Sequence, residues 1–176
     1  MKIRLDRLGD EPFTWQETLE LPRDRLARDE VVALGSVACS GRILKLPEGF
    51  LLRAELTYEQ TLACMRCLRP LATPVDCRFE LALVIDPAAA TPSAGERELE
   101  SDELGVLHLH GPAFDTEPVL IEQLQLNVPM KPLCRDDCAG LCGTCGADLN
   151  DGPCGCGAPA DPRWSGLAAL RDRLTE

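Results

Sequence analysis

The chain has 176 residues and a formal net charge of −11, with 45% hydrophobic and only 4% aromatic residues. This length suits one domain with at most a small appendage, and its core must be mostly aliphatic. The negative charge argues against a broad electrostatic grip on nucleic acid, because such binding rests on neutralising phosphates. We find no apolar run of transmembrane length and no apolar N-terminal segment of signal-peptide type, so we expect a cytoplasmic protein without a membrane partner.

Alternation of apolar and polar residues predicts short strands in the N-terminal part of the chain, at residues 1–5 and 13–21. The charged segment 22–28 fits a helical turn. Residues 31–46 are apolar but interrupted by two glycines, which indicates bent or bulged strands.

The clearest strand pattern lies in the middle of the chain. Every second residue from 50 to 58 is apolar or aromatic, and a similar alternation returns at 75–83. We interpret residues 70–74, which begin and end with proline, as part of the connection. The two strands are therefore expected to pair antiparallel, with the Cys64-x-x-Cys67 motif on the loop that joins them.

An acidic loop and a helix are predicted next. Residues 86–122 hold nine acids and one base, and the part at 86–104 has the composition of a loop without a core of its own. A short strand at 106–110 precedes a helix at about 116–127, capped by Asp115 or Thr116.

The C-terminal part of the chain is cysteine-rich and ends in a further predicted helix. An Asp161-Pro162 start and an apolar stripe at helical spacing favour this last helix. The fold class predicted is α+β: a mostly antiparallel sheet with one helix forms a core domain at 1–132. Residues 133–176 would form a zinc-binding lobe and the C-terminal helix, packed on the core as one structural unit.

Eight of the ten cysteines form four close pairs. These are Cys64/Cys67, Cys134/Cys138, Cys142/Cys145 and Cys154/Cys156. Thiolates at such spacings suit tetrahedral zinc, and a reducing compartment favours metal ligation over disulfides. Gly146, directly after Cys145, fits a knuckle turn in which the backbone takes a positive φ.

The spacing between the pairs also predicts which of them share a metal. Three residues separate 134/138 from 142/145, which cramps a tetrahedron, whereas eight separate 142/145 from 154/156. We therefore predict two structural Zn²⁺ ions, each with four sulfurs. The first would be held by Cys64, Cys67, Cys134 and Cys138, and the second by Cys142, Cys145, Cys154 and Cys156.

The remaining cysteines and the histidines are given structural roles. Cys39 and Cys77 stand on apolar strand faces and are expected to be small buried hydrophobes. His108 and His110 are expected to face solvent rather than complete an open zinc site. For the paired cysteines, a thiol redox site and an iron–sulfur cluster remain as alternatives to zinc.

The motifs together resemble the bacterial YceD family over roughly residues 30–176. The motifs that carry the resemblance are Cys64-x-x-Cys67-Leu68, Glu122 to Pro132, Leu133 to Asn150 with its Gly-Leu-Cys and Leu-Asn, and Asp161-Pro162-Arg163. Gly143 departs from the proline that many relatives carry there. Some relatives keep only counterparts of 64, 67, 134 and 138, in agreement with the pairing above. The resemblance implies a cytoplasmic role in accumulation or processing of large-subunit ribosomal RNA, and it implies no enzymatic activity.

The function predicted is that of a non-enzymatic, zinc-binding factor in large-subunit assembly. Its partner would be a large-subunit ribosomal RNA precursor, a basic ribosomal protein bound by the acidic segment 86–122, or both. Direct RNA contact would use Arg66, Arg69 and Arg78, expected near the first zinc. The alternatives are a protein–protein adaptor or regulator without RNA contact, and a thiol redox or zinc-sensing protein. The sequence holds no nucleotide or hydrolase motif, so no small-molecule substrate is inferred.

Overall fold

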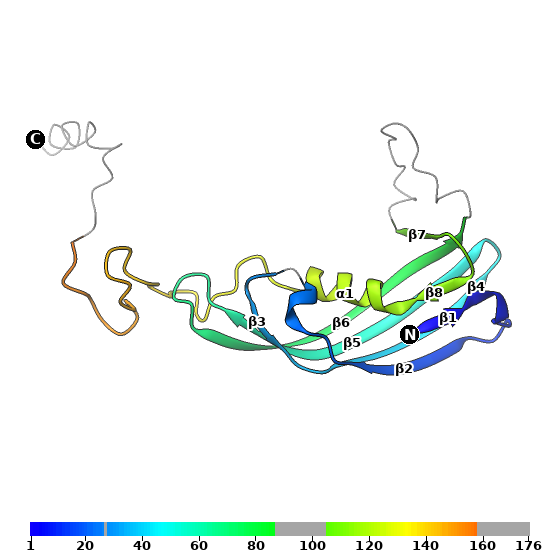
Figure 1. Cartoon of the computed structure of the whole chain (residues 1–176), viewed down its shortest axis with the longest axis horizontal. Coiled ribbons are helices and arrows are strands. Elements are labelled where there is room, and N and C mark those ends of the chain that lie inside the picture. Colours follow the sequence, from blue (N-terminus) through cyan, green and yellow to red (C-terminus); the bar gives the residue numbers. More distant parts are fainter. Residues whose placement is uncertain (27, 87–104, 158–176) are drawn as a thin grey trace, which may run out of the picture.

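The computed structural model describes residues 1–26, 28–86 and 105–157, and within them one curved sheet dominates (Figure 1). The sheet has six strands in the order β2-β4-β5-β6-β7, with β3 also paired to β5. Its strands are β2 (Phe13–Leu19), β3 (Val31–Leu34), β4 (Val37–Leu46), β5 (Gly49–Ala63), β6 (Pro70–Ile85) and β7 (Val106–Leu109). The smaller elements are β1 (Lys2–Arg4), β8 (Ala113–Asp115), α1 (Thr116–Leu126) and two short 3-10 turns, η1 (Leu5–Arg7) and η2 (Arg23–Leu26).

The long β5–β6 hairpin is the axis of the sheet. The strands pair antiparallel from Phe50 opposite Leu83 to Ala63 opposite Pro70. Alternate residues of β5 are buried, because one face of the strand packs into the core. This confirms the predicted pairing and the position of the Cys64-x-x-Cys67 motif on the joining turn.

The interpretation of residues 70–74 as a connection is wrong, since they belong to β6. Pro70 and Pro74 stand opposite Ala63 and Glu59 of β5. Proline lacks a backbone donor and is tolerated where a strand has an open edge. Among the described residues, β6 acquires a second neighbour only where β7 joins it at Ala82, so the prolines lie on such an edge.

Helix α1 covers one face of the sheet, as Figure 1 shows. The side chain of Asp115 accepts a hydrogen bond from the Glu117 amide, which confirms the predicted cap. Val119, Leu120 and Leu124 of the helix are buried in the same core as the inner residues of β4 and β5. The sheet and this one helix therefore share a single main core.

The distant pairing of β1 with β8 was not predicted. Ile3 stands opposite Phe114, and both side chains are buried. The amide and hydroxyl of Thr116 both donate to the Met1 carbonyl, which ties the start of α1 to the start of the chain. Three-residue strands carry too little alternation to predict their partners, so this contact emerges only in the folded structure.

The other strand predictions are confirmed with two refinements. Residues 31–46 divide into β3 and β4, with a register shift between Val31 and Ala33. Strand β7 runs parallel to β6, while the other pairings of the sheet are antiparallel. The helix predicted from Asp161 and all of the predicted loop 86–104 except Asp86 lie outside the described residues. No helix in the described ranges is long and apolar enough to cross a bilayer.

The two unpaired cysteines differ in burial. Cys39 is 3% exposed, as predicted. Cys77 is only half-buried, because it lies on β6 near the open edge of the sheet. There its sulfur accepts a hydrogen bond of 3.1 Å from the side-chain amide of Asn127. His108 and His110 are exposed, which confirms their predicted environment.

Candidate metal centres

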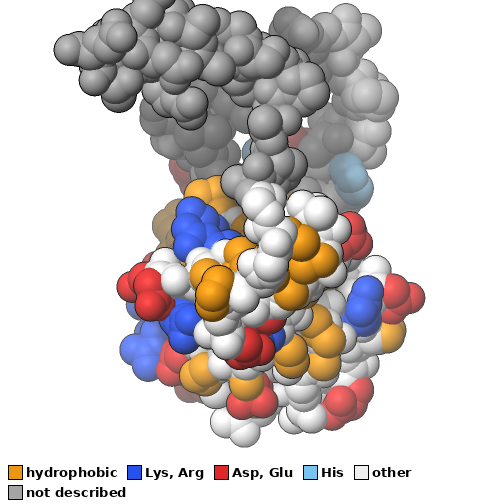
Figure 2. Space-filling view, turned by 90° about the vertical axis from the view of Figure 1, so that its left-hand side faces the viewer, with side chains coloured by type: hydrophobic (Ala, Val, Ile, Leu, Met, Phe, Trp, Pro, Cys, Tyr) orange, Lys and Arg blue, Asp and Glu red, His pale blue; other side chains and the backbone are white. Residues whose placement is uncertain are grey.

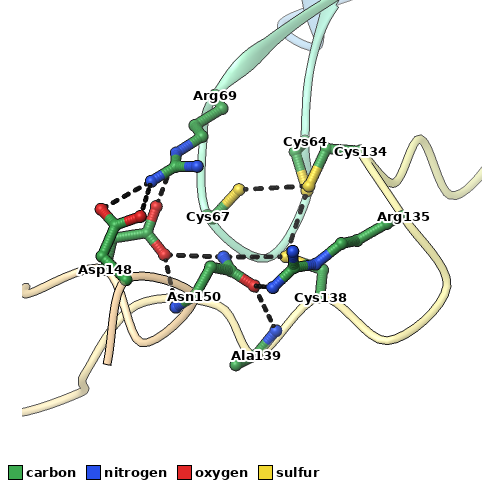
Figure 3. A network of polar contacts seen from close by, with 10 residues as sticks. Cys64, Cys67, Arg69, Cys134, Arg135, Cys138, Ala139, Asp148 and Asn150 are labelled. Atoms are coloured by element: carbon green, nitrogen blue, oxygen red, sulfur yellow. Dashed lines mark hydrogen bonds and ion pairs between the residues drawn. The ribbon is translucent and has the colours of Figure 1, made fainter. Parts of the chain in front are cut away.

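Four cysteine sulfurs from two distant segments meet at the end of the β5–β6 hairpin (Figure 3). Cys64 and Cys67 come from the turn, and Cys134 and Cys138 from the segment that follows α1. We call this set the first centre. All four sulfurs lie within 4.8 Å of one another. The Cys64–Cys138 pair is separated by 3.8 Å and the Cys67–Cys134 pair by 3.6 Å.

These distances fit a tetrahedral zinc site. A tetrahedron with Zn–S bonds of about 2.3 Å has sulfur–sulfur edges of about 3.8 Å. Both recorded sulfur–sulfur separations lie close to that edge. The four sulfurs would fill all positions around the ion, so the chemistry of this donor set is that of a closed, structural site rather than an open catalytic one.

Backbone hydrogen bonds bring the two segments of the first centre together. The Met65 amide donates to the Pro132 carbonyl over 2.9 Å, and the Leu141 amide donates to the Arg66 carbonyl over 3.1 Å. Gly140 has a φ of +78°, and a side chain there would press on the Arg66 carbonyl. A residue with a side chain at position 140 would therefore be strained and would push the two segments apart.

A second set of four sulfurs follows directly along the chain. Cys142, Cys145, Cys154 and Cys156 also lie within 4.8 Å of one another and form the second centre. They are more exposed than most ligands of the first centre. In both groups the cysteine pairs lie together as the sequence spacing predicted. In the described part of the chain, these are the two groups of His, Cys, Asp or Glu side chains that lie close enough together to hold a metal ion.

Both centres begin with the same kind of turn, in which the residue after the second cysteine has a positive φ. At the second centre this residue is Gly146, with φ of +73°, as predicted. At the first centre it is Leu68, with φ of +61°. A left-handed conformation costs a residue with a side chain roughly 1–2 kcal/mol, so the first turn is strained at a position where the second is not.

The loop between Cys145 and Cys154 of the second centre reaches the first centre, and Figure 3 shows two of its residues, Asp148 and Asn150, beside Arg69 and the sulfurs of the first centre. Asn150 on this loop donates to the Cys138 sulfur over 3.4 Å and accepts from the Ala139 amide over 2.8 Å. Arg69, just after the first turn, forms ion pairs of 2.8 Å with Asp148 and 2.7 Å with Asp151. The loop that closes the second centre thus also orients a ligand of the first.

Hydrogen bonds favour the charged thiolate at the leading cysteine of each turn. Backbone amides, that of Cys67 foremost, lower the pKa of Cys64 to about 6. The amides of Cys145 and Thr144 likewise help to lower the pKa of Cys142 to about 6. At Cys134, desolvation of the sulfur and the neighbouring thiols raise the pKa to about 12, although much of this residue is exposed. Four thiolates cannot crowd together without a cation, which a divalent metal would supply.

The structure does not gather the three predicted arginines into one patch. Arg66 donates to the Cys138 carbonyl over 2.7 Å, and Arg69 is engaged by Asp148 and Asp151. Arg78 lies far along β6, roughly 30 Å from Arg69 at ~3.3 Å per residue of strand, and pairs with Glu55 instead. Figure 2, which views the cysteine-rich end of the molecule, shows basic and acidic side chains close together rather than one continuous basic area.

Sequence reasoning missed the residues that support the centres. In the sequence, Asn150 stands out only as part of the motif that carries the family resemblance, and Arg69 is predicted to contact RNA. The one available signal was the Leu149-Asn150 motif, because a side-chain amide close in sequence to metal ligands is well placed to support a sulfur. The sulfur that Asn150 contacts, that of Cys138, belongs to the first centre, and the spacing of residues in the sequence does not indicate this contact.

Comparison with known proteins identifies the family of this chain. A family model described as large ribosomal RNA subunit accumulation protein YceD matches residues 52–171. This chain belongs to the YceD family. An uncharacterized protein of Mycobacterium tuberculosis is 31% identical over 176 residues, covering 97% of this chain and 81% of the relative.

A plant relative has a descriptive name. It is the large ribosomal RNA subunit accumulation protein YCED homolog 1, chloroplastic, of Zea mays. It is 31% identical over 110 residues, which cover 51% of this chain and 38% of the maize protein. An uncharacterized protein of Mycobacterium leprae is 29% identical over 132 residues, covering 73% of this chain and 56% of the relative. No solved structure gave a match.

Replacing Asn150 by Ala should weaken metal binding at the first centre without removing a ligand. The Cys138 sulfur loses its side-chain donor, and loss of such supporting contacts typically lowers metal affinity about 10–100-fold. Competition with a chromophoric chelator measures this affinity. Asn127→Ala is the matched control, because Asn127 also donates to a cysteine sulfur, but at Cys77 outside both centres. Equal affinities in Asn150→Ala and the wild type would contradict the assignment.

Replacing Leu68 by Gly should stabilise the metal-loaded chain. The substitution removes the left-handed strain of roughly 1–2 kcal/mol but adds about 0.5–1 kcal/mol of backbone freedom in the unfolded state. Little packing is lost, since Leu68 is 64% exposed. We expect the free energy of unfolding in denaturant to rise by up to about 1.5 kcal/mol. Met65→Gly, in the same turn without a positive φ, should lower it, and a loss of stability in Leu68→Gly would refute the argument.

Proposed function

We propose that this protein is a non-enzymatic factor in the accumulation and processing of large-subunit ribosomal RNA, acting in the cytoplasm with two structural zinc ions. The observation that carries the proposal is the convergence of two four-cysteine sets in a member of the YceD family. A factor of this kind needs a rigid surface for assembly rather than a reactive centre. Cross-linking by metal provides rigidity where the hairpin would otherwise end in an open turn.

Zinc fits these centres better than redox chemistry does. A reactive Cys-x-x-Cys motif typically sits at a helix N-terminus, which lowers the pKa of one thiol. Here Cys64 and Cys67 lie on a turn between two strands, and four sulfurs meet rather than two. When bound, zinc would neutralise part of the thiolate charge and hold the two segments together.

The partner proposed is a large-subunit ribosomal RNA precursor, a basic ribosomal protein, or both. The chain's charge of −11 favours a basic protein as one component of the complex. Arg66, Arg69 and Arg78 stay candidates for RNA contact, but each has an internal acceptor that an RNA phosphate would have to displace.

A second candidate function, that of a protein–protein adaptor without RNA contact, is favoured by exposed apolar side chains. Met65 and Leu68 in the first turn are 54% and 64% exposed, and Met130 nearby along the ligand segment is 93% exposed. Exposed apolar groups close to a rigid centre suit contact with another protein.

Metal analysis tests the two-zinc assignment. The wild-type chain should carry two zinc ions, and Cys64→Ser or Cys145→Ser should each lose about one. Because the first centre joins distant segments, Cys64→Ser should destabilise the whole domain. For scale, binding of structural zinc to small peptides contributes on the order of 10 kcal/mol to their folding. Cys145→Ser should mainly loosen the segment 142–156. Cys39→Ala, outside both sets, should keep two ions, and a stoichiometry near one or iron absorption in the wild type would overturn the assignment.

Depletion in cells tests the ribosomal role. We expect large-subunit ribosomal RNA to fall relative to small-subunit RNA, and the wild-type gene to restore it. Crosslinking followed by identification of bound RNA and protein then separates the two candidate functions. A ribosomal RNA precursor among the crosslinks supports direct contact, and protein crosslinks alone support the adaptor. Unchanged ribosomal RNA together with no ribosomal component would exclude the ribosomal role.

A further inference from the structure

The face of the sheet opposite α1 carries a hollow of about 960 Å³. The residues whose side chains point to this face come from β2, β4, β5 and β6, and they alternate along each strand with residues of the core. Three of them are arginines, Arg42, Arg53 and Arg78, and two are glutamates, Glu55 and Glu80. No segment in the described part of the chain covers them.

Two of these arginines stand directly opposite each other. Arg42 of β4 pairs in register with Arg53 of β5. Like charges in this arrangement repel and destabilise a sheet. A strand pair that is otherwise regular therefore tolerates a repulsive contact on its open face, and an anion lying between the two side chains would convert the repulsion into attraction.

The glutamates on this face balance only part of the arginine charge. Arg78 donates from Nε and Nη2 to Glu55, at 3.0 and 2.8 Å. Arg53 Nε lies 2.9 Å from Glu80 Oε1 in an ion pair but forms no hydrogen bond with the described residues. Arg42 has neither an ion pair nor a hydrogen bond with the described residues. The hollow thus holds donors that the protein itself does not satisfy.

The rest of the hollow is formed by short polar side chains and by backbone that the core holds in place. Thr14 and Ser40 offer hydroxyl groups beside Arg42, and their short side chains leave the space open. Behind them, the Trp15 ring packs against Gly41 so closely that any side chain at 41 would collide with it. The backbone under the hollow is therefore held in place by the core.

We propose that this hollow binds a phosphate group, with Arg42 and Arg53 as its main ligands. Arginine suits phosphate because its planar group donates two parallel hydrogen bonds, and hydroxyl groups add further donors. The phosphate comes either from a free phosphorylated compound or from an RNA backbone. The site is independent of the metal centres and goes beyond the proposed function, because it does not require a ribosomal partner.

Calorimetry on the zinc-loaded full chain tests the site, with inorganic pyrophosphate and a short single-stranded RNA as probes. We expect at least one probe to bind, and R42Q/R53Q to weaken that binding by tenfold or more. R42K, which keeps the charge but loses the planar fork, should retain part of it. R4Q/R25Q is the matched control: it removes the same charge from two exposed ion pairs elsewhere and should change binding less than twofold. Because Arg42 has no partner to lose, R42Q should melt no lower than the wild type.

The two probes distinguish the sources of the phosphate. Pyrophosphate binding without RNA binding indicates a free compound. RNA binding that pyrophosphate displaces indicates the backbone, with a slope of log affinity against log salt of roughly −0.7 per phosphate bound. The proposal is overturned if neither probe binds, if R42Q/R53Q binds like the wild type, or if the control loses as much. Equal binding of a polyglutamate peptide would show a general anion surface and would also overturn it.

Discussion

The constraint on which this structure depends is the meeting of Cys64 and Cys67 with Cys134 and Cys138. The paired sulfurs are 74 and 67 residues apart in the chain. Closing so long a loop costs chain entropy, and without a cation four crowded thiols resist ionisation. A bound metal ion would compensate both costs at the point where the hairpin has least support, because β6 has only one described neighbour there.

The second centre depends on the first through a small polar network. Arg69 reaches Asp148 and Asp151, and Asn150 touches Cys138, so the loop that closes one centre rests on the other. Asp148 in turn accepts from the Asn150 amide and side chain, and this helps to keep its pKa below the ordinary value. Because both centres share this loop, loss of a metal ion from the second centre should also alter the positions of the ligands in the first centre.

Much of the fold was predictable because it rests on local patterns. The period-two alternation of β5 marks the face that packs into the core, and the separation of the cysteine pairs limits which of them can reach one ion. The failures arose where tertiary context decides. Pro70 is tolerated in a strand because β6 lies at an open edge there, and β1 and β8 are too short for their sequence pattern to indicate that they pair. The role of Asn150 depends on a sulfur of the other centre, which no local rule could identify.

The arginines of this acidic chain divide into two groups. Arg66 and Arg69 hold the cysteine-rich segment to the hairpin, so their donors are engaged by the fold itself. Arg42 and Arg53 lie on the open face and are only partly balanced. Charges farther away than about 8 Å, the Debye length at physiological ionic strength, are largely screened. A net charge of −11 therefore disfavours binding of an anion over a large area of the surface but does not prevent binding at one local site. Whether an anion binds is decided by the few charged groups within that distance of it.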